Sequence, residues 1–313
     1  MTAAGDQLKG YLMIGGSALM FGATGVFIRL TDMPLSLLLS LRMFLAAAMV
    51  AAVFAYRHWW RELARPGVRR KLLLLGALDT AQMWTFFMAV RYMDVALAVF
   101  LSYMSPIYIA ALAPRLLRQR TERVVVVALV LSIIGIAVML LPGLLVPDLG
   151  VSTAGMVCGL LAGVFLALFF IVAKDVRYDV AGDTMLVCNG AVVGILMLPV
   201  GLIQTLGSGY RLTTGDLWVV LGLAVIGTAL GGTIFLQGMR YIRVQHTSIV
   251  GLLEPVVAPL YAFLLLGEPT DVWAIVGGGL ILIAAVLVVL FGKGEEGMAG
   301  SPEEALAEAE ASP

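Results

Sequence analysis

The sequence predicts an all-α integral membrane protein of ten transmembrane helices, arranged as two inverted five-helix repeats. Its composition, its series of apolar runs and an internal similarity between its two halves lead to this prediction. Of 313 residues, 61% are hydrophobic and 13% are charged. That is more apolar side chain than a water-soluble domain of this size can bury. A water-soluble globular protein is therefore excluded.

Ten apolar runs follow one another along the chain, separated by charged residues or by Gly and Pro. A transmembrane helix needs about 20 apolar residues. The runs of the first half lie near residues 10–30, 34–56, 72–92, 95–116 and 123–142. Those of the second half lie near residues 152–173, 181–203, 216–240, 244–266 and 272–291. Each run is therefore expected to form one spanning helix.

The runs divide the chain into two parts of five runs each, flanked by short termini. We assign residues 10–146 to the first repeat and residues 147–292 to the second, after a short cytoplasmic segment at residues 1–9. Residues 293–313 are rich in Glu, Ala, Gly and Ser and contain little apolar side chain. Such a segment cannot offset the entropy cost of ordering, so we expect a disordered acidic tail.

The positions of Lys and Arg predict that both termini face the cytoplasm. Cytoplasmic loops carry an excess of these residues. With the N-terminus inside, sixteen of the twenty Lys and Arg fall on the cytoplasmic side, three on the other side, and Arg42 within a span. We therefore expect a multi-pass protein of the cell (plasma or inner) membrane.

An internal similarity relates the two halves. Residues 86–119 align with residues 235–268 without a gap and share eight identities. The pair Arg91-Tyr92 matches Arg240-Tyr241, and Pro106 matches Pro255 within an apolar run. Because five is an odd number of spans, the second copy enters the membrane inverted. Many secondary transporters use this architecture to alternate access to a midplane site.

Short motifs in both halves resemble the EamA branch of the drug/metabolite transporter superfamily. These motifs are Val95 to Pro106, Ser248 to Pro255, Gly267-Glu268, Phe21-Gly22 and Leu41 to Phe44. The resemblance covers residues 10–292. It implies a ten-helix inverted-repeat carrier with a central cavity, often an exporter of amino acids or other small metabolites. Arg118-Gln119 departs from the family pattern, which usually has Gly-Glu or Glu at that place, and this weakens any role for a symmetric pair of acids.

Two acidic residues lie inside spans, where a charge is costly and usually faces a cavity or a partner. Glu254 directly precedes Pro255, which removes a helix hydrogen bond and predicts a kink. Pro106 predicts the same kink in the first repeat, so both prolines are hinge candidates. Glu254 and Asp79 are candidates for substrate binding and proton coupling. The alternative for Glu254 is a carboxyl that stays protonated or caps the backbone of a neighbouring helix.

A central cavity is expected between the runs 10–30, 72–92, 95–116, 152–173, 216–240 and 244–266. The spacing of Asp79, Gln82, Met83 and Phe86 places them on one helix face. The matching positions of the second repeat include Gly231 and Gly232, which favour close helix packing. The candidate cavity residues are Asp79, Gln82, Met83, Phe86, Phe100, Tyr103, Phe165, Phe169, Phe235 and Glu254. Each aromatic residue could instead face lipid or the core.

Two further polar residues receive other interpretations. Arg42 is interpreted as a packing residue, with Asn189 at a loosely equivalent place in the second repeat. His246 begins an apolar run, where a histidine is usually solvated but could titrate near neutral pH.

Several motifs of enzymes and pumps do not occur in the sequence. It has no P-loop, no H-E-x-x-H and no cluster of His and Cys. We therefore expect no enzyme activity, no metal, no cofactor and no nucleic-acid partner. The predicted function is a secondary-active or facilitative transporter, expected to export a small-molecule substrate across the lipid bilayer. The alternatives are a non-transporting scaffold or sensor, and a channel, which two inverted halves fit less well.

Overall fold

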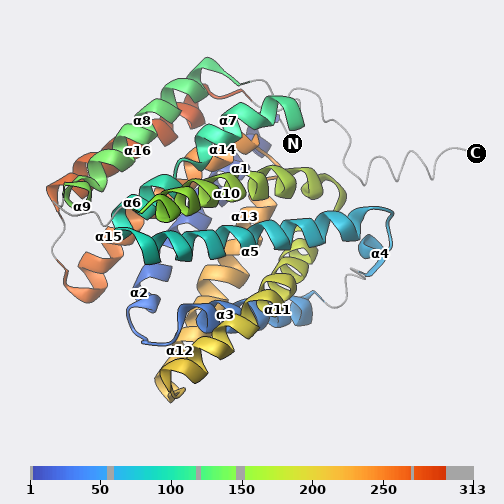
Figure 1. The fold of residues 1–313 in the computed structure, drawn as a ribbon. Helices are drawn as coiled ribbons and strands as arrows, with labels where there is room; N and C mark the ends of the chain where they lie inside the picture. The colour runs from blue at the N-terminus through green and yellow to red at the C-terminus, as the bar shows by residue number, and fades with distance from the viewer. Residues whose placement is uncertain (1–2, 55–59, 118–120, 146–151, 269–270, 294–313) are drawn as a thin grey trace, which may run out of the picture.

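A computed structural model describes residues 3–54, 60–117, 121–145, 152–268 and 271–293. Within these ranges every regular element is a helix, in agreement with the predicted all-α class (Figure 1). Three predicted features lie outside the described residues: the tail from residue 294, the repeat boundary at residues 146–147, and the pair at residues 118–119.

The apolar runs of the first half all form helices. These are α1 (Ala3–Gly22) with α2 (Thr24–Ile28), α3 (Leu35–Val53), α5 (Val68–Tyr92), α6 (Val95–Ser102) with α7 (Ser105–Leu116), and α8 (Arg123–Met139) with the short α9 (Leu141–Leu144). The four-residue helix α4 (Trp60–Leu63) precedes α5.

The second half follows the same order. It contains α10 (Thr153–Asp179), α11 (Gly182–Ser208), α12 (Thr214–Gly222) continued by the π-helix η2 (Leu223–Leu230) and α13 (Gly231–Gly238), then α14 (Val244–Gly251) with α15 (Leu253–Leu266), and α16 (Val272–Phe291). The π-helix was not predicted. Thr228 spans its widened turn, since its hydroxyl donates to the Leu223 carbonyl at 3.2 Å.

The described residues contain nine helical segments long and apolar enough to cross a membrane, where the sequence predicted ten. The remaining run, the fifth in the chain, forms α8, which has 17 residues. At 1.5 Å per residue α8 extends about 26 Å, less than the roughly 30 Å of a bilayer core. Pro142 has no amide to donate to the Val138 carbonyl, so the helix ends at Met139 and the chain turns into α9.

Both predicted kinks occur as helix breaks at matching positions. Pro106 cannot donate to the carbonyl of Ser102, the last residue of α6, and Pro255 cannot donate to that of Gly251, the last residue of α14. α6 and α14 each have eight residues. The two broken helices therefore change direction at the same point of the repeat.

The helices pack in a small set of pairs. α5 lies against α10, α1 against α13, α3 against α11, α7 against α14, and α8 against α16. The pair α8 and α16 runs along one edge of the bundle, at the upper left of Figure 1. There the two backbones approach closely, because a Cβ on Gly135 would lie 2.8 Å from the Gly277 carbonyl oxygen. Only glycine permits this contact.

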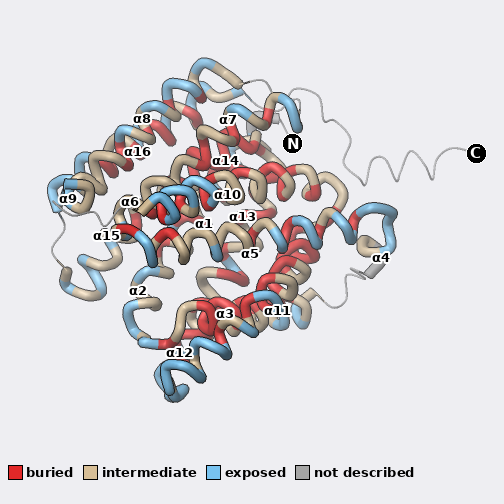
Figure 2. Tube along the Cα trace, viewed as in Figure 1, coloured by how far each residue is buried: buried red, intermediate tan, exposed pale blue. Residues whose placement is uncertain are grey.

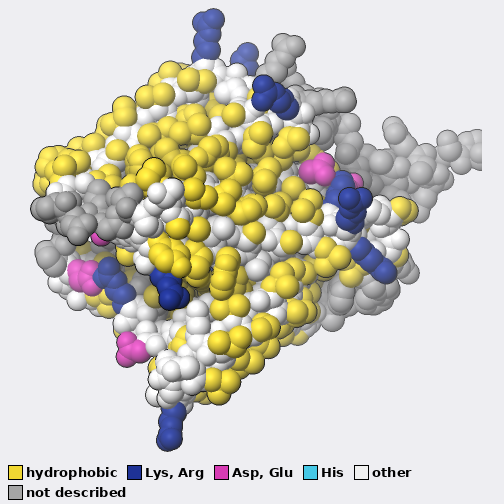
Figure 3. All heavy atoms as spheres, viewed as in Figure 1, with side chains coloured by type: hydrophobic (Ala, Val, Ile, Leu, Met, Phe, Trp, Pro, Cys, Tyr) yellow, Lys and Arg dark blue, Asp and Glu magenta, His cyan; other side chains and the backbone are white. Residues whose placement is uncertain are grey.

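The outer surface is apolar, as a bilayer requires. Buried residues line the inward faces of the helices, while large side chains such as Leu206 and Ile203 are 82% and 71% exposed (Figure 2). On the face shown in Figure 3, hydrophobic side chains form a broad area and the charged side chains lie around its margin. This distribution is that of a protein surrounded by lipid.

Polar contacts join the two halves at the end of the bundle where α1 begins, which we call the N-terminal end. The Tyr11 hydroxyl donates to the Val288 carbonyl at 3.1 Å and lies 2.8 Å from Nδ1 of His246. Glu122 forms an ion pair of 3.0 Å with Arg243, and its carboxylate lies 3.4 Å from Nε2 of His246. His246 is therefore buried, with no exposed surface, rather than solvated.

Lys174 forms a second connection at this end. Its side chain is fully buried, and its ammonium donates to the carbonyls of Met239 at 2.7 Å and Ile242 at 2.9 Å. These carbonyls follow the end of α13, where a helix leaves its last carbonyl groups without internal partners. Lys174 thereby fixes the end of α10 to the connection between α13 and α14.

Candidate functional site

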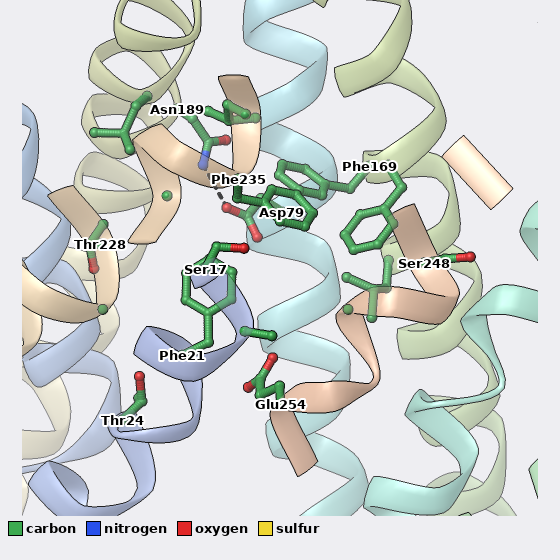
Figure 4. Close-up of a pocket in the computed structure, with 18 of the residues that line it drawn as sticks. Ser17, Phe21, Thr24, Asp79, Phe169, Asn189, Thr228, Phe235, Ser248 and Glu254 are labelled. Carbon is green, nitrogen blue, oxygen red and sulfur yellow. Dashed lines mark hydrogen bonds between the residues drawn. The ribbon is translucent and has the colours of Figure 1, made fainter. Parts of the chain in front are cut away.

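A cavity of about 290 Å³ lies in the middle of the bundle, and we call it the central cavity (Figure 4). Residues of every predicted lining run contribute to it, and α3 and α11 contribute as well. No described residue of α8, α9, α12 or α16 lines it. The cavity is therefore lined by helices from both halves of the chain, while the described residues of the edge pair α8 and α16 do not contribute to it.

Three charged side chains converge on the central cavity. Asp79 comes from α5, Glu254 from the start of α15, directly after the helix break, and Arg42 from α3. Asp79 accepts a hydrogen bond of 2.7 Å from the Asn189 amide, drawn as a dashed line in Figure 4. Asn189 of α11, the residue at the place loosely equivalent to Arg42, is thus the hydrogen-bond partner of Asp79.

Arg42 has an unusual environment for a cation inside a membrane. Its guanidinium interacts electrostatically with Asp79 and Glu254. Among the described residues, however, no ion pair links it to either acid, and its Nε is buried without a hydrogen-bond partner. A buried donor without a partner costs free energy, which an anionic ligand would recover. Arg42 is thus a ligand-binding candidate.

Four phenylalanine rings form a continuous row along one wall of the central cavity. Phe235 of α13 lies 5.8 Å from Phe21 and 5.3 Å from Phe170, between ring centroids, and Phe170 lies 6.0 Å from Phe169. All four rings are tilted relative to their neighbours, a favourable geometry for aromatic pairs. The row offers an apolar surface in the same cavity as the charged groups.

Three hydroxyl groups of the cavity donate hydrogen bonds to backbone carbonyls. Ser17 donates to the Ile14 carbonyl at 2.7 Å, Thr228 to Leu223, and Ser248 to a carbonyl one turn earlier at 2.8 Å. The free lone pairs of these oxygens can then accept hydrogen bonds from a ligand. Acceptors of this kind suit the N–H groups of an amine.

The structure brings half of the predicted candidate residues into the central cavity. These are Asp79, Tyr103, Phe169, Phe235 and Glu254. Gln82, Met83, Phe86, Phe100 and Phe165 do not line it. The predicted stripe on α5 reaches the cavity only at Asp79.

Three of the residues that do not line the cavity pack in apolar clusters between helices. Met83 packs against a cluster that includes Met43 and Met197, Phe86 packs near Ala89, and Phe100 packs against the α8–α16 edge at Ile136. Met83, Phe86 and Phe100 therefore contribute to helix packing.

We expect Phe235→Leu to weaken binding of substrates with large apolar side chains by about tenfold, because it removes the central ring of the row. The KM for transport of such a substrate measures the effect. Phe165→Leu is the matched control, since Phe165 does not line the cavity. Equal changes in the two variants would contradict the binding role of the row.

The geometry defines a helical membrane protein with a central, charged and aromatic cavity between two sets of helices. The chain belongs to the EamA-like transporter family, whose family model matches residues 8–141 and again residues 153–290. The chain is thus a membrane transporter of this family, and both halves carry the family pattern.

Relatives of nearly full length support the assignment. An uncharacterized transporter of Archaeoglobus fulgidus is 29% identical over 87% of this chain and 93% of its own length. The uncharacterized inner membrane transporter YicL of Salmonella typhimurium is 27% identical over 91% of this chain and 97% of its own. A solved crystal structure matches 93% of this chain and 99% of its own, with a TM-score of 0.74 and 14% identity, which is a likeness of fold.

Proposed function

We propose that the protein is a secondary-active or facilitative carrier of small zwitterionic metabolites such as amino acids, working in export by alternating access. The observation that carries this proposal is the combination of Arg42, two carboxylates and an aromatic row in one cavity of about 290 Å³. Few small metabolites carry both charges and an apolar part. An α-amino acid has all three.

Each part of an amino acid has a counterpart in the central cavity. The guanidinium of Arg42 suits a carboxylate, which it can bind through two parallel N–H groups. Asp79 and Glu254 suit an ammonium group, assisted by the acceptor oxygens of Ser17 and Thr228. The phenylalanine row suits an apolar side chain.

The packing pattern supports two inverted repeats as the moving parts. Each helix of one half has a helix at the matching position of the other half. If every helix is replaced by its match, the α5–α10 contact becomes the α13–α1 contact, and both contacts occur. The pairs α3–α11 and α8–α16 convert into themselves. Together with the matched breaks before Pro106 and Pro255, this favours rocking of two similar halves, with these breaks as hinges.

The N-terminal end is proposed to face the cytoplasm. The Lys and Arg distribution supports this orientation, because the starts of α1, α8 and α14 meet at that end of the bundle through Tyr11, Glu122 and His246. Export then requires a substrate to enter from this side and to leave at the opposite side.

The test is flux of a panel of labelled amino acids and their amine and carboxylate analogues in proteoliposomes, with and without a pH gradient. Saturable flux of a zwitterion is expected. Movement of no panel member by a folded, oriented preparation would overturn the proposal and favour the scaffold or sensor alternative.

Proton coupling is tested on Glu254. If Glu254 carries the coupled proton, Glu254→Gln should lower gradient-driven accumulation by about tenfold while exchange without a gradient persists, because a neutral amide cannot release a proton. Glu268→Gln, beyond the end of α15 and outside the cavity, is the control. Full gradient dependence in Glu254→Gln would exclude this residue and leave Asp79.

A further inference from the structure

A second cavity, of about 340 Å³, lies at the N-terminal end of the bundle and is separate from the central cavity in its lining. It is surrounded by the end of α10, the start of α11, the end of α13 and the first turns of α1. Four cations line it: Lys9, Arg65, Arg177 and Arg240. We call it the basic cavity.

Three carboxylates also line the basic cavity, and each is already engaged. Asp179 forms an ion pair of 2.9 Å with Lys71, which lies outside the cavity. Glu62 accepts a hydrogen bond of 3.2 Å from the backbone amide of Ala181, near the start of α11. Asp183 is buried, at 2% exposed, and interacts electrostatically with Arg177.

The cations are engaged less completely. Arg177 uses two of its five N–H groups, donating to the carbonyls of Leu236 at 3.0 Å and Val180 at 2.7 Å. Lys9 donates to the Tyr241 hydroxyl at 3.3 Å and lies 5.0 Å above its ring. Donors of both side chains therefore remain for a ligand.

Arg240 is the least engaged of the four. Among the residues that the structure describes, its guanidinium has neither a hydrogen bond nor an ion pair, although the residue is partly buried. It also lies near enough to Arg177 for the two like charges to repel. A shared anion between the two guanidinium groups would convert this repulsion into attraction.

We propose that the basic cavity binds a phosphate group between Arg177, Arg240 and Lys9. A tetrahedral phosphate has enough acceptor oxygens to meet two guanidinium forks and an ammonium at once. Basic pockets between transmembrane helices on the cytoplasmic side are typical sites for anionic lipid headgroups. The phosphate could equally belong to a free phosphate ion, and the chemistry of recognition is the same.

The ligand would connect the two repeats. Lys9 belongs to α1 of the first repeat, whereas Arg177 and Arg240 belong to the second. Bound phosphate would therefore hold the two halves together at the N-terminal end of the bundle, independently of any substrate in the central cavity.

The test measures binding by the purified full chain with two probes. Inorganic phosphate is titrated against a chloride control of equal ionic strength, and phosphatidylglycerol is compared with phosphatidylcholine in nanodiscs. Saturable binding of either anionic probe is expected, with a rise in melting temperature. Tighter binding of phosphatidylglycerol assigns a lipid headgroup, and binding of inorganic phosphate alone assigns a free anion.

Variants decide whether binding occurs in the basic cavity. Arg240→Gln should weaken it by about tenfold, and Arg240→Lys should restore part of it. Lys9→Gln, at an exposed position, should also weaken it, which keeps the test valid if Arg240→Gln misfolds. Arg115→Gln, an exposed cation of the last turn of α7 outside the cavity, should have no effect. Binding of neither probe, or equal loss in Arg115→Gln, would overturn the proposal.

Discussion

Arg42→Gln should lower transport efficiency, kcat/KM, for a zwitterionic substrate by about a hundredfold, because it removes the cation proposed to bind the carboxylate. Arg42→Lys should lose about tenfold, since an ammonium keeps the charge but not the paired N–H groups. Both variants leave Asp79 and Glu254 in place to bind an ammonium group.

The substrate itself supplies the sharpest control. An amine analogue that lacks the carboxylate has no partner for Arg42, so its flux should fall little in Arg42→Gln. Arg91→Met, an exposed cation at the end of α5, controls for loss of positive charge in general. If Arg42→Gln retains its melting temperature and moves the zwitterion at the original rate, Arg42 has only a packing role.

Gly277→Leu should destabilise the protein by about 3 kcal/mol or more, because the new side chain would overlap the Gly135 carbonyl and the backbone of α8. The melting temperature of the detergent-solubilised chain measures the loss. Gly279→Leu is the matched control on the same helix, since a Cβ there would meet nothing within 4 Å.

Stability and transport should separate in these variants. Gly277→Leu acts at an edge that contributes no described residue to the central cavity. The surviving folded fraction should therefore keep its KM while total activity falls. Equal stability of Gly277→Leu and Gly279→Leu would show that α8 and α16 do not remain in contact in the membrane.

Much of the fold was predictable because lipid imposes a simple rule on sequence. Runs of apolar residues of spanning length must be helical, and a proline inside such a run can interrupt it, as Pro106 and Pro255 do, although Pro199 lies within the unbroken α11. The π-helix was not predictable, because η2 contains no proline and its composition is as apolar as that of its neighbours. The ending of α8 at Met139 depended on a single proline near the end of the run.

The site residues could be predicted where a charged side chain interrupts an apolar run. Asp79 and Glu254 were recognised because a carboxyl inside an apolar run requires a partner or a cavity. Phe21 and Phe170 gave no such signal, since helices surrounded by apolar residues on all sides have no distinguishable inner face. The Asn189–Asp79 hydrogen bond joins different repeats, and helical periodicity carries no information about contacts between distant segments.

The π-helix η2 changes how this protein can diverge from its relatives. A π-helix accommodates one additional residue in a turn compared with an α-helix. Substitutions that returned Leu223–Leu230 to α-helical geometry at the same length would therefore rotate α13 by about 100° relative to α12. Gly232 and Phe235 would then turn away from the cavity. Loss of one residue within the same segment would instead leave the orientation of α13 nearly unchanged, so this wall of the site tolerates a deletion better than a change of helix type.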